Sequence, residues 1–220
     1  MALPVLVMGR SGSGKTYSLK NFQPDEVGII SVEKGRLPFR SDLKVARIPK
    51  WFSDAKDYAT LNRAKYAWIC NVIEKSKYKS IVIDDSQYLL VNELFDRAAE
   101  KGYDKFVQMA ANFRNLIHSI NELEDDDKIV YFLHHTETDS DGREKTKTIG
   151  KMLDEKLTVE GCFDIVIYCQ DHKFITQANG QSTAKTPEGM FDLEIPNDLK
   201  AVDVAIREYY GMNQMKEGTK

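Results

Sequence analysis

The chain has 220 residues, of which 42% are hydrophobic and 30% are charged. This composition can form a sizeable core, and it excludes a disordered, collagen-like or Pro-rich chain. The 31 Lys and Arg residues nearly balance the 34 Asp and Glu residues, giving a net charge of −3, so any binding of nucleic acid must be local. No apolar run reaches the roughly 18 residues of a membrane helix, and we expect neither a membrane span nor a signal peptide.

Short apolar runs alternate with helical segments along most of the chain. Continuous apolar runs are typical of strands buried on both faces of a parallel sheet. They cover residues 3–8, 27–32, 81–83, 128–133 and 165–169, and the last is expected to pair with residues 174–177. Helices are predicted between them at residues 14–21, 54–75, 87–100 and 105–123. This order predicts an α/β fold with a mostly parallel central sheet flanked by helices.

The C-terminal part of the chain has a different pattern. Residues 171–198 are typical of short antiparallel strands, with turns at residues 179–180 and 187–189, and a last helix is predicted at residues 199–210. We therefore expect one domain over residues 1–212, with a C-terminal antiparallel β extension, and a polar tail at 213–220. Residues 137–156 form the most polar stretch inside the domain and are expected to be a mobile loop.

The three cysteines of the chain form no CxxC pair. Cys70, Cys162 and Cys169 lie far apart or on a predicted strand. This spacing predicts neither a disulfide framework nor a zinc site. We expect buried thiols in the reducing environment of a cytoplasm.

Residues 9–16 match the phosphate-loop pattern G-x-x-x-x-G-K-[ST]. Glycines let the backbone curl so that N–H groups point at phosphate oxygens, and the following helix adds its positive end. Lys15 would reach the β- and γ-phosphates, and Thr16 would offer its hydroxyl to Mg²⁺. We expect Lys15 to be exposed. The predicted nucleotide contacts are Gly9, Arg10, Ser11, Gly12, Ser13, Gly14, Lys15, Thr16 and Tyr17.

Two aspartates follow the third apolar run. A buried strand would bring Asp84 to the C-terminal edge of the sheet, beside the phosphate loop, where it would hold Mg²⁺ mostly through water. Asp85 has two interpretations: it orients the attacking water, or it caps the helix that begins near Ser86. The cap is the preferred one.

Other candidate catalytic groups end the second and fourth runs or lie near the C-terminus. Glu33 is the better candidate to polarise the attacking water, although a surface acid would leave the same pattern. His134 and His135 end a strand expected between the first and third, and alternation should turn one of them toward the γ-phosphate; two plain surface histidines are the alternative. Lys185 either reaches a neighbouring subunit's nucleotide or is a solvated turn lysine.

Together these residues resemble the RecA-like P-loop ATPases of bacteriophage recombination and replication modules, and among them the short Sak-type single-strand-annealing proteins. The resemblance rests on residues 9–16, 30–35, 81–85, the strand ending in His134 and His135, and residues 147–151 and 184–187. It implies a RecA-like core with Glu33 as catalytic glutamate. It also implies that the histidines couple the γ-phosphate to a DNA-binding loop, although RecA-like proteins often carry Gln or Asn there.

The resemblance further implies an ATPase that uses ATP and Mg²⁺ and is coupled to single-stranded DNA binding or annealing. The DNA contacts would come from Arg143, Lys145, Lys147 and Lys151. The implied partners are single-stranded DNA, further copies of the chain in a ring or filament, and a single-strand-binding protein, in the cytoplasm of the host cell. Two alternatives stay open: a P-loop kinase of a nucleoside or small metabolite, and a non-hydrolysing ATP-gated assembly factor.

Overall fold

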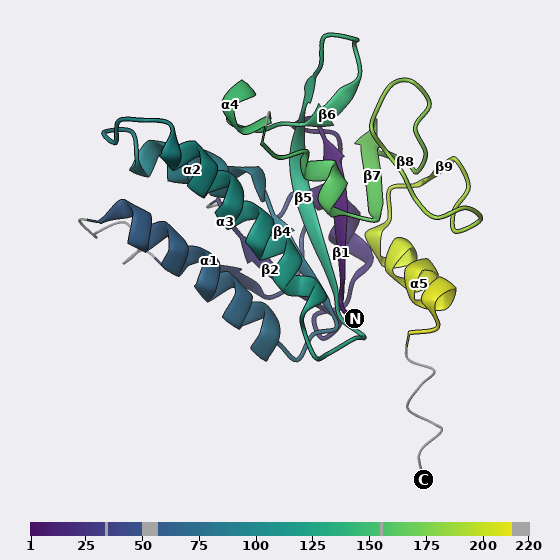
Figure 1. The fold of residues 1–220 in the computed structure, drawn as a ribbon. Coiled ribbons are helices and arrows are strands. Elements are labelled where there is room, and N and C mark those ends of the chain that lie inside the picture. Colours follow the sequence, from purple (N-terminus) through teal and green to yellow (C-terminus); the bar gives the residue numbers. More distant parts are fainter. Residues whose placement is uncertain (34, 50–56, 155, 213–220) are drawn as a thin grey trace.

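The computed structural model of the chain describes residues 1–33, 35–49, 57–154 and 156–212 (Figure 1). The strands in this part are β1 (Leu3–Gly9), β2 (Val27–Ser31), β3 (Val45–Arg47), β4 (Ser80–Asp84), β5 (Ile129–Thr138), β6 (Glu144–Thr146), β7 (Ile165–Gln170), β8 (Lys173–Ile175) and β9 (Glu194–Pro196). The helices are α1 (Tyr58–Lys75), α2 (Gln87–Asp96), α3 (Asp104–Asn121), α4 (Lys151–Asp154) and α5 (Leu199–Tyr210), with short 3₁₀ helices η1 (Thr16–Asn21) and η3 (Val159–Cys162).

The central sheet has the order β3-β2-β4-β5-β1-β7-β8-β9. In this order, neighbouring strands from β3 through β1 to β7 are parallel. Strands β8 and β9 continue the sheet in antiparallel orientation, and β6 pairs antiparallel with β5 outside this order. Strand β5 lies between β1 and β4, as the sequence predicts. The mostly parallel α/β fold with antiparallel strands on its C-terminal side is therefore confirmed, and it is the fold expected for a P-loop nucleotide-binding domain.

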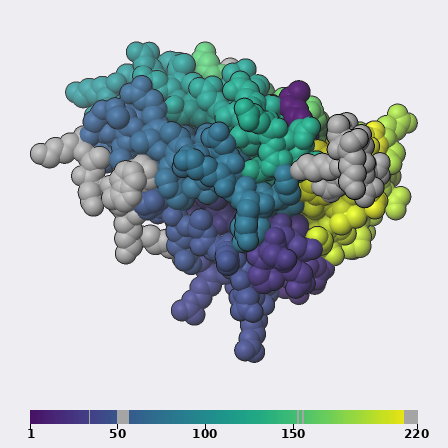
Figure 2. Space-filling view, turned by 90° about the horizontal axis from the view of Figure 1, so that it is seen from below, coloured from purple at the N-terminus to yellow at the C-terminus, as the bar shows by residue number. Residues whose placement is uncertain are grey.

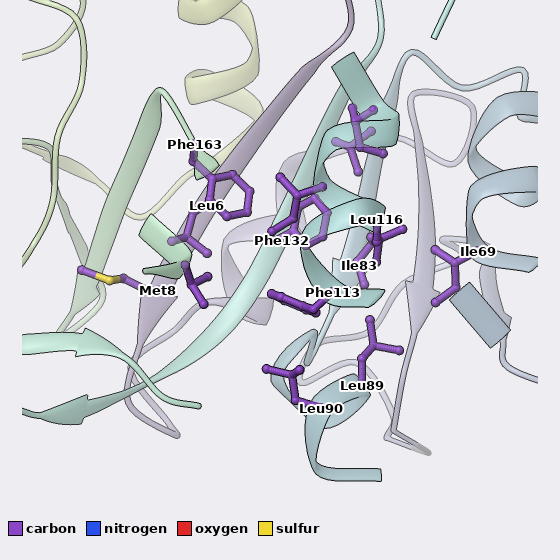
Figure 3. Packing of buried hydrophobic residues seen from close by; sticks show 14 of the residues in the cluster. Leu6, Met8, Ile69, Ile83, Leu89, Leu90, Phe113, Leu116, Phe132 and Phe163 are labelled. Atoms are coloured by element: carbon purple, nitrogen blue, oxygen red, sulfur yellow. The ribbon is translucent and has the colours of Figure 1, made fainter. Parts of the chain in front are cut away.

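Helices cover both faces of the sheet. On one face α1, α2 and α3 pack against strand residues such as Leu6 and Phe132, and Figure 3 shows Phe113 and Leu116 of α3 near Phe132 and Ile83. On the other face η1 and α5 pack against alternate strand residues such as Val7. Because both faces are covered, the central strands are continuously apolar, which explains the runs in the sequence.

Several predicted boundaries differ from the observed ones. The helix after the glycine loop is the short 3₁₀ helix η1, which begins at Thr16. Strand β5 continues to Thr138, so His134 and His135 lie within a strand rather than at its end. Helix α1 begins at Tyr58 because Asp57 caps it, accepting from the Thr60 N–H. The predicted helical residues 54–56 and the predicted polar tail at 213–220 lie outside the described residues.

The polar segment at residues 137–156 is a hairpin and a short helix rather than an irregular loop. Strand β6 pairs with the end of β5, with Thr136 opposite Thr146 and Thr138 opposite Glu144. The Asp139 carboxylate closes the turn between them by accepting from the backbone N–H groups of Asp141 and Arg143. The pairing was not predictable from apolar periodicity because the segment carries few apolar side chains.

The C-terminal extension follows the prediction closely. Strand β7 forms a hairpin with β8, β8 pairs with β9, and α5 has the predicted bounds with Asp198 as its N-terminal cap. All three cysteines carry free thiols. In the described part of the chain, no helix has the length and apolar character that crossing a membrane requires.

A buried polar cluster fixes α5 to the sheet at the N-terminal ends of the strands. The Asp203 carboxylate accepts from the Ser80 hydroxyl at 2.6 Å, from the Tyr131 hydroxyl at 2.9 Å and from Arg207 Nε at 2.8 Å. Arg207 also donates to the backbone carbonyls of Lys79 and Asp127. Ser80, Tyr131 and Arg207 therefore all depend on the Asp203 carboxylate as a hydrogen-bond acceptor.

We predict that Asp203→Ala destabilises the fold more than the loss of a helix cap. Removing the buried carboxylate leaves the half-buried Arg207 charge without its only acidic partner among the described residues, which costs about 3–5 kcal/mol. Asp198→Ala, which removes the α5 cap, is the matched control and should cost about 1 kcal/mol. Urea unfolding measures both. An Asp203→Ala loss no larger than the Asp198→Ala loss would contradict the structural role of this cluster.

Candidate functional site

The loop from Gly9 to Lys15 joins β1 to η1 and turns tightly against β7. Gly12 and Gly14 have positive φ angles of 79° and 108°, a backbone region that favours glycine. At Gly9 the constraint is space, because a Cβ there would lie 2.4 Å from the carbonyl oxygen of Cys169. The spacing of glycines in the sequence therefore has a physical cause at each position, and the loop has the backbone freedom that phosphate binding needs.

Lys15 is buried, which corrects the expectation that it is exposed. Only 6% of the residue is accessible, and its Nζ donates to the carbonyl oxygens of Gly9 at 2.7 Å and Arg10 at 2.9 Å. Burial lowers the pKa of its amine, and the nearby Asp85 and Asp84 carboxylates oppose that shift. The lysine is thus held inside the loop by two carbonyl acceptors, and a phosphate would compete with them for its protons.

Thr16 and Asp84 meet across the carboxyl edge of the sheet. The Thr16 hydroxyl donates to Asp84 Oδ1 at 2.9 Å, although the two residues come from different strand ends. Burial raises the pKa of Asp84 to about 6, with the neighbouring Asp85 charge adding to the shift. A hydroxyl and a carboxylate at one point form an oxygen donor set that suits Mg²⁺, so the residues present fit the predicted metal site.

Asp85 and His135 form a second pair beside this site. His135 Nε2 lies 3.1 Å from Asp85 Oδ1, and the imidazole packs edge-on against the Tyr88 ring. Asp85 has a positive φ of 60°, a conformation that is uncommon outside glycine and clusters at functional sites. Helix α2 begins at Gln87, and its N-cap residue is Ser86, which makes no side-chain cap hydrogen bond. The predicted capping role of Asp85 is therefore wrong, and its carboxylate contacts His135 instead.

His134 points away from the cleft and into the protein, as alternation along β5 requires. Its Nε2 lies 2.8 Å from the backbone carbonyl of Lys147, and its Nδ1 lies 2.9 Å from the Ser86 hydroxyl. Burial lowers the pKa of the imidazole to about 4. Because a carbonyl only accepts, Nε2 carries the proton and Nδ1 accepts from Ser86. His134 is therefore a buried neutral histidine.

Glu33 is turned toward α2. Its carboxylate accepts from Asn92 Nδ2 at 2.9 Å, and its backbone carbonyl accepts from the Ser31 hydroxyl. It is not among the described residues that line the cleft beside the phosphate loop. Of the two candidate acids for water activation, Asp85 is the one that the structure brings to the cleft.

The cleft beside the phosphate loop has a volume of about 920 Å³. One end carries three rings: Tyr17 lies edge-on to Phe39, with centroids 6.2 Å apart, and edge-on to His172, with centroids 5.6 Å apart. The backbone N–H of His172 donates to the backbone carbonyl of Ser13, and this hydrogen bond connects the β7–β8 turn to the phosphate loop. Flat apolar rings are suited to contact a nucleobase. Sequence reasoning identified Tyr17 but missed Phe39 and His172, since neither belongs to a motif.

One wall of the cleft is formed by residues 35–47, which follow β2, include Phe39 and end with β3. This wall carries three arginines, Arg36, Arg40 and Arg47, which are the arginines that the sequence offers for the lid of the kinase alternative, although it shows no lid pattern. Their convergence on the cleft depends on the parallel pairing of the edge strand β3 with β2. Nothing in the sequence pattern predicted that strand.

The predicted DNA-contacting residues lie on the β5–β6 hairpin and just after it. Arg143 pairs with Asp139 and Asp141, and Lys145 pairs with Asp154 and Glu137. Lys147 and Lys151 are exposed and form no ion pair with any described residue. The charge available to a polyanion is therefore concentrated on two of the four predicted residues.

Two other sequence candidates lie apart from the cleft. Lys185 is exposed on an extended segment whose backbone bridges Val166 of β7, and it does not line the cleft in the described part. Arg10 turns from the loop to the hairpin, donating to Glu144 Oε1 at 3.1 Å and to the Thr138 hydroxyl at 2.8 Å. The phosphate loop thus contacts the β5–β6 hairpin through Arg10, while its following residues line the cleft.

A family model described as an AAA domain matches residues 1–192, which extend from β1 almost to β9. No curated protein matches the chain.

The buried state of His134 predicts a pH-dependent stability. The folded pKa is about 4 and the ordinary value is 6.5, so below pH 6.5 the unfolded chain takes up a proton that the folded chain does not. Stability therefore falls as the pH falls through this window. Between pH 7 and pH 5 the loss due to His134 should be about 2 kcal/mol.

His134→Gln should remove that part of the pH dependence, because its amide can still donate to the Lys147 carbonyl but does not titrate. The measurement is urea unfolding of both proteins at pH 7 and pH 5. If the free energy of unfolding falls by the same amount between pH 7 and pH 5 in both proteins, His134 does not stay neutral in the folded state.

Proposed function

The chain belongs to the AAA domain family, and we propose that it hydrolyses ATP with Mg²⁺ and couples this turnover to single-stranded DNA. One observation carries the first part: the phosphate loop, the Thr16 hydroxyl and the Asp84 carboxylate converge at the carboxyl edge of the sheet. These are the groups that phosphoryl transfer requires at one point. The family match supports a nucleotide-binding ATPase domain.

The chemistry follows from the roles of these side chains. Lys15 and the loop amides would hold the phosphates, and Thr16 and Asp84 would hold Mg²⁺, which would supply positive charge beside the phosphate oxygens. Asp85 and His135 orient the attacking water, since both side chains line the cleft and contact each other. Glu33 contributes only if its hydrogen bond to Asn92 opens. Catalysis is then a matter of positioning and charge stabilisation.

The coupling to DNA is supported by the backbone of Lys147. Its N–H donates to the His135 carbonyl at 2.8 Å, and its carbonyl accepts from His134 Nε2. A smaller hollow of about 360 Å³ lies beside the cleft, and His135, Tyr88 and Lys147 all line it. A shift of His135 with the state of the nucleotide would therefore move the hairpin. RecA-type and Sak-type proteins are the phage recombination and replication proteins that the sequence resembles.

Assembly is part of the same proposal. Lys185 is exposed and lies outside the chain's own cleft, so a head-to-tail neighbour is what would bring it to a nucleotide. Heterologous contacts of this kind close into rings or continue as filaments. A single-strand-binding protein is a further proposed partner, on the resemblance alone.

A second candidate function is a P-loop kinase of a nucleoside or small metabolite. The three arginines in the cleft lining favour it, because a small metabolite with its own phosphate would need such a site. Turnover that rises with a small acceptor and not with DNA would support the kinase. Tight ATP binding without turnover under either condition would support the assembly factor instead.

We predict that Lys15→Ala abolishes nucleotide binding and also lowers stability. The loss of its amine removes the phosphate contact and leaves the Gly9 and Arg10 carbonyls without their donor, at a cost of about 1–3 kcal/mol. The measurements are binding of a fluorescent ATP analogue and ATPase rate, with and without single-stranded DNA. Lys77→Ala, an exposed lysine before β4, is the control. ATP hydrolysis by a folded Lys15→Ala protein would refute the proposed function.

The two candidate acids predict different kinetics. Asp85→Asn should retain ATP binding and lower turnover on the order of 10² to 10⁴-fold, the range for a positioned proton acceptor. Glu33→Gln should have a smaller effect because Glu33 binds Asn92. Single-turnover hydrolysis separates binding from chemistry. If Glu33→Gln stops turnover and Asp85→Asn does not, Glu33 is the activating acid, as the RecA resemblance implies.

The hairpin charges predict a difference between two matched double variants. Lys147→Ala with Lys151→Ala should weaken single-stranded DNA binding more than Arg143→Ala with Lys145→Ala, because the second pair is already engaged by acids. Each variant removes two positive charges. Fluorescence anisotropy of a labelled oligonucleotide at low salt measures the affinity, and basal ATP binding should persist. If the two double variants lose the same affinity for the oligonucleotide, or lose none, the hairpin is not part of the DNA-binding surface.

A further inference from the structure

The three arginines of the cleft wall have no acidic partner among the described residues, which is also true of Arg63 and Arg114 outside the cleft. Arg36, Arg40 and Arg47 form no ion pair with any described residue, and Arg47 makes only a long hydrogen bond to the Gly35 carbonyl, at 3.5 Å, within the described part. Elsewhere in the described part, Arg10, Arg97, Arg143 and Arg207 are paired with carboxylates. Three unpaired guanidinium groups therefore face one cleft, and that cleft contains the phosphate loop.

The segment that carries them is held in place by apolar side chains. Leu37 and Phe39 pack against the core on the η1 and α5 side, and Leu43 is buried there. Arg36 and Arg40 flank the packed residues and are exposed. Figure 2 shows the purple-to-blue N-terminal part of the chain along the lower edge of the molecule, with two projections into solvent. The backbone is anchored while the charged groups remain accessible.

The strand register places Arg47 close to the metal end of the cleft. Arg47 lies opposite Ser31 of β2, and Ser31 lies opposite Asp84 of β4. Two strand spacings separate the backbones of Arg47 and Asp84, which is about 10 Å. Arg36 and Arg40 precede and follow Phe39 in the sequence, and both line the same cleft. The wall thus spreads positive charge along the cleft.

The charge of the cleft lining matches that of its proposed ligand. Lys15 and the three arginines are cationic and Asp84 and Asp85 are acidic, which leaves a net of two positive charges. A magnesium complex of a nucleoside triphosphate carries about two negative charges. Without the wall the lining would be net negative and would repel the same ligand.

We infer that Arg36, Arg40 and Arg47 bind the phosphate oxygens of the bound nucleotide together with the phosphate loop. This rests on the proposed function, since it assigns the cleft to a nucleotide. Guanidinium groups donate in a planar fork that matches phosphate oxygens. The same chain then supplies the cations that surround the terminal phosphates, so nucleotide binding does not require a neighbouring subunit.

Inorganic tripolyphosphate tests this inference because it has the phosphates of ATP without the base or ribose. Its affinity is measured by competition with a fluorescent ATP analogue in the presence of Mg²⁺, for the wild type and for each Arg→Gln variant. Every single variant should lose about 3- to 10-fold in affinity, and the triple variant on the order of 100-fold or more. The dependence of affinity on salt should also be weaker in the triple variant.

The control is Arg63→Gln, which removes the same charge from an exposed arginine on α1 outside the cleft lining. Unchanged tripolyphosphate affinity in the triple variant, or an equal loss in Arg63→Gln, overturns the inference. Loss of ATP affinity with unchanged tripolyphosphate affinity also overturns it, because the arginines would then contact the base or ribose.

The proposed function and this inference fail in different ways. If the wild type binds no nucleotide, or the Lys15→Ala protein binds it normally, the proposed function fails. Suppose instead that the wild type binds nucleotide, the Lys15→Ala protein does not, and the triple arginine variant binds as tightly as the wild type. Then only the inference about the three arginines fails. A nucleotide affinity that is constant on dilution to the monomer, with losses in the triple variant, supports binding by cations of the same chain.

Discussion

The parallel pairing of β1, β5 and β4 is the constraint on which the site depends. Because all three strands run in the same direction, their carboxyl ends meet at one edge, and the residues that follow them become neighbours. Thr16, His135 and Asp84 come from three distant parts of the sequence and reach one cleft only through this pairing. The covering helices on both faces bury the strands and hold that edge in place.

Within the site, buried charged and polar groups are held by partners that a ligand would replace. Lys15 donates to two loop carbonyls, and Thr16 donates to Asp84. The raised pKa of Asp84 and the lowered pKa of Lys15 have the same cause, since burial disfavours both charged forms. A triphosphate with its metal would supply the missing opposite charges. Ligand binding and relief of this desolvation are therefore linked.

The β5–β6 hairpin is connected to the site through the backbone as well as through side chains. Lys147 contacts both histidines, and Glu144 accepts from Arg10 of the phosphate loop. The hairpin is thus attached at two points: Lys147 binds the histidines of β5, and Glu144 binds the phosphate loop. These contacts are a physical connection between the nucleotide-binding loop and the hairpin.

The sequence by itself determined the parts that depend on local chemistry. Apolar runs predicted the buried strands, the glycine spacing predicted the phosphate loop, and Asp198 marked the start of α5, because each is set by neighbouring residues. The tertiary structure decided which side chains meet. Burial of Lys15, the partners of Asp85 and Glu33, and the convergence of the arginine wall all depend on strand order and on packing between segments far apart in the chain. Local periodicity does not encode those long-range contacts, so only the folded sheet could show them.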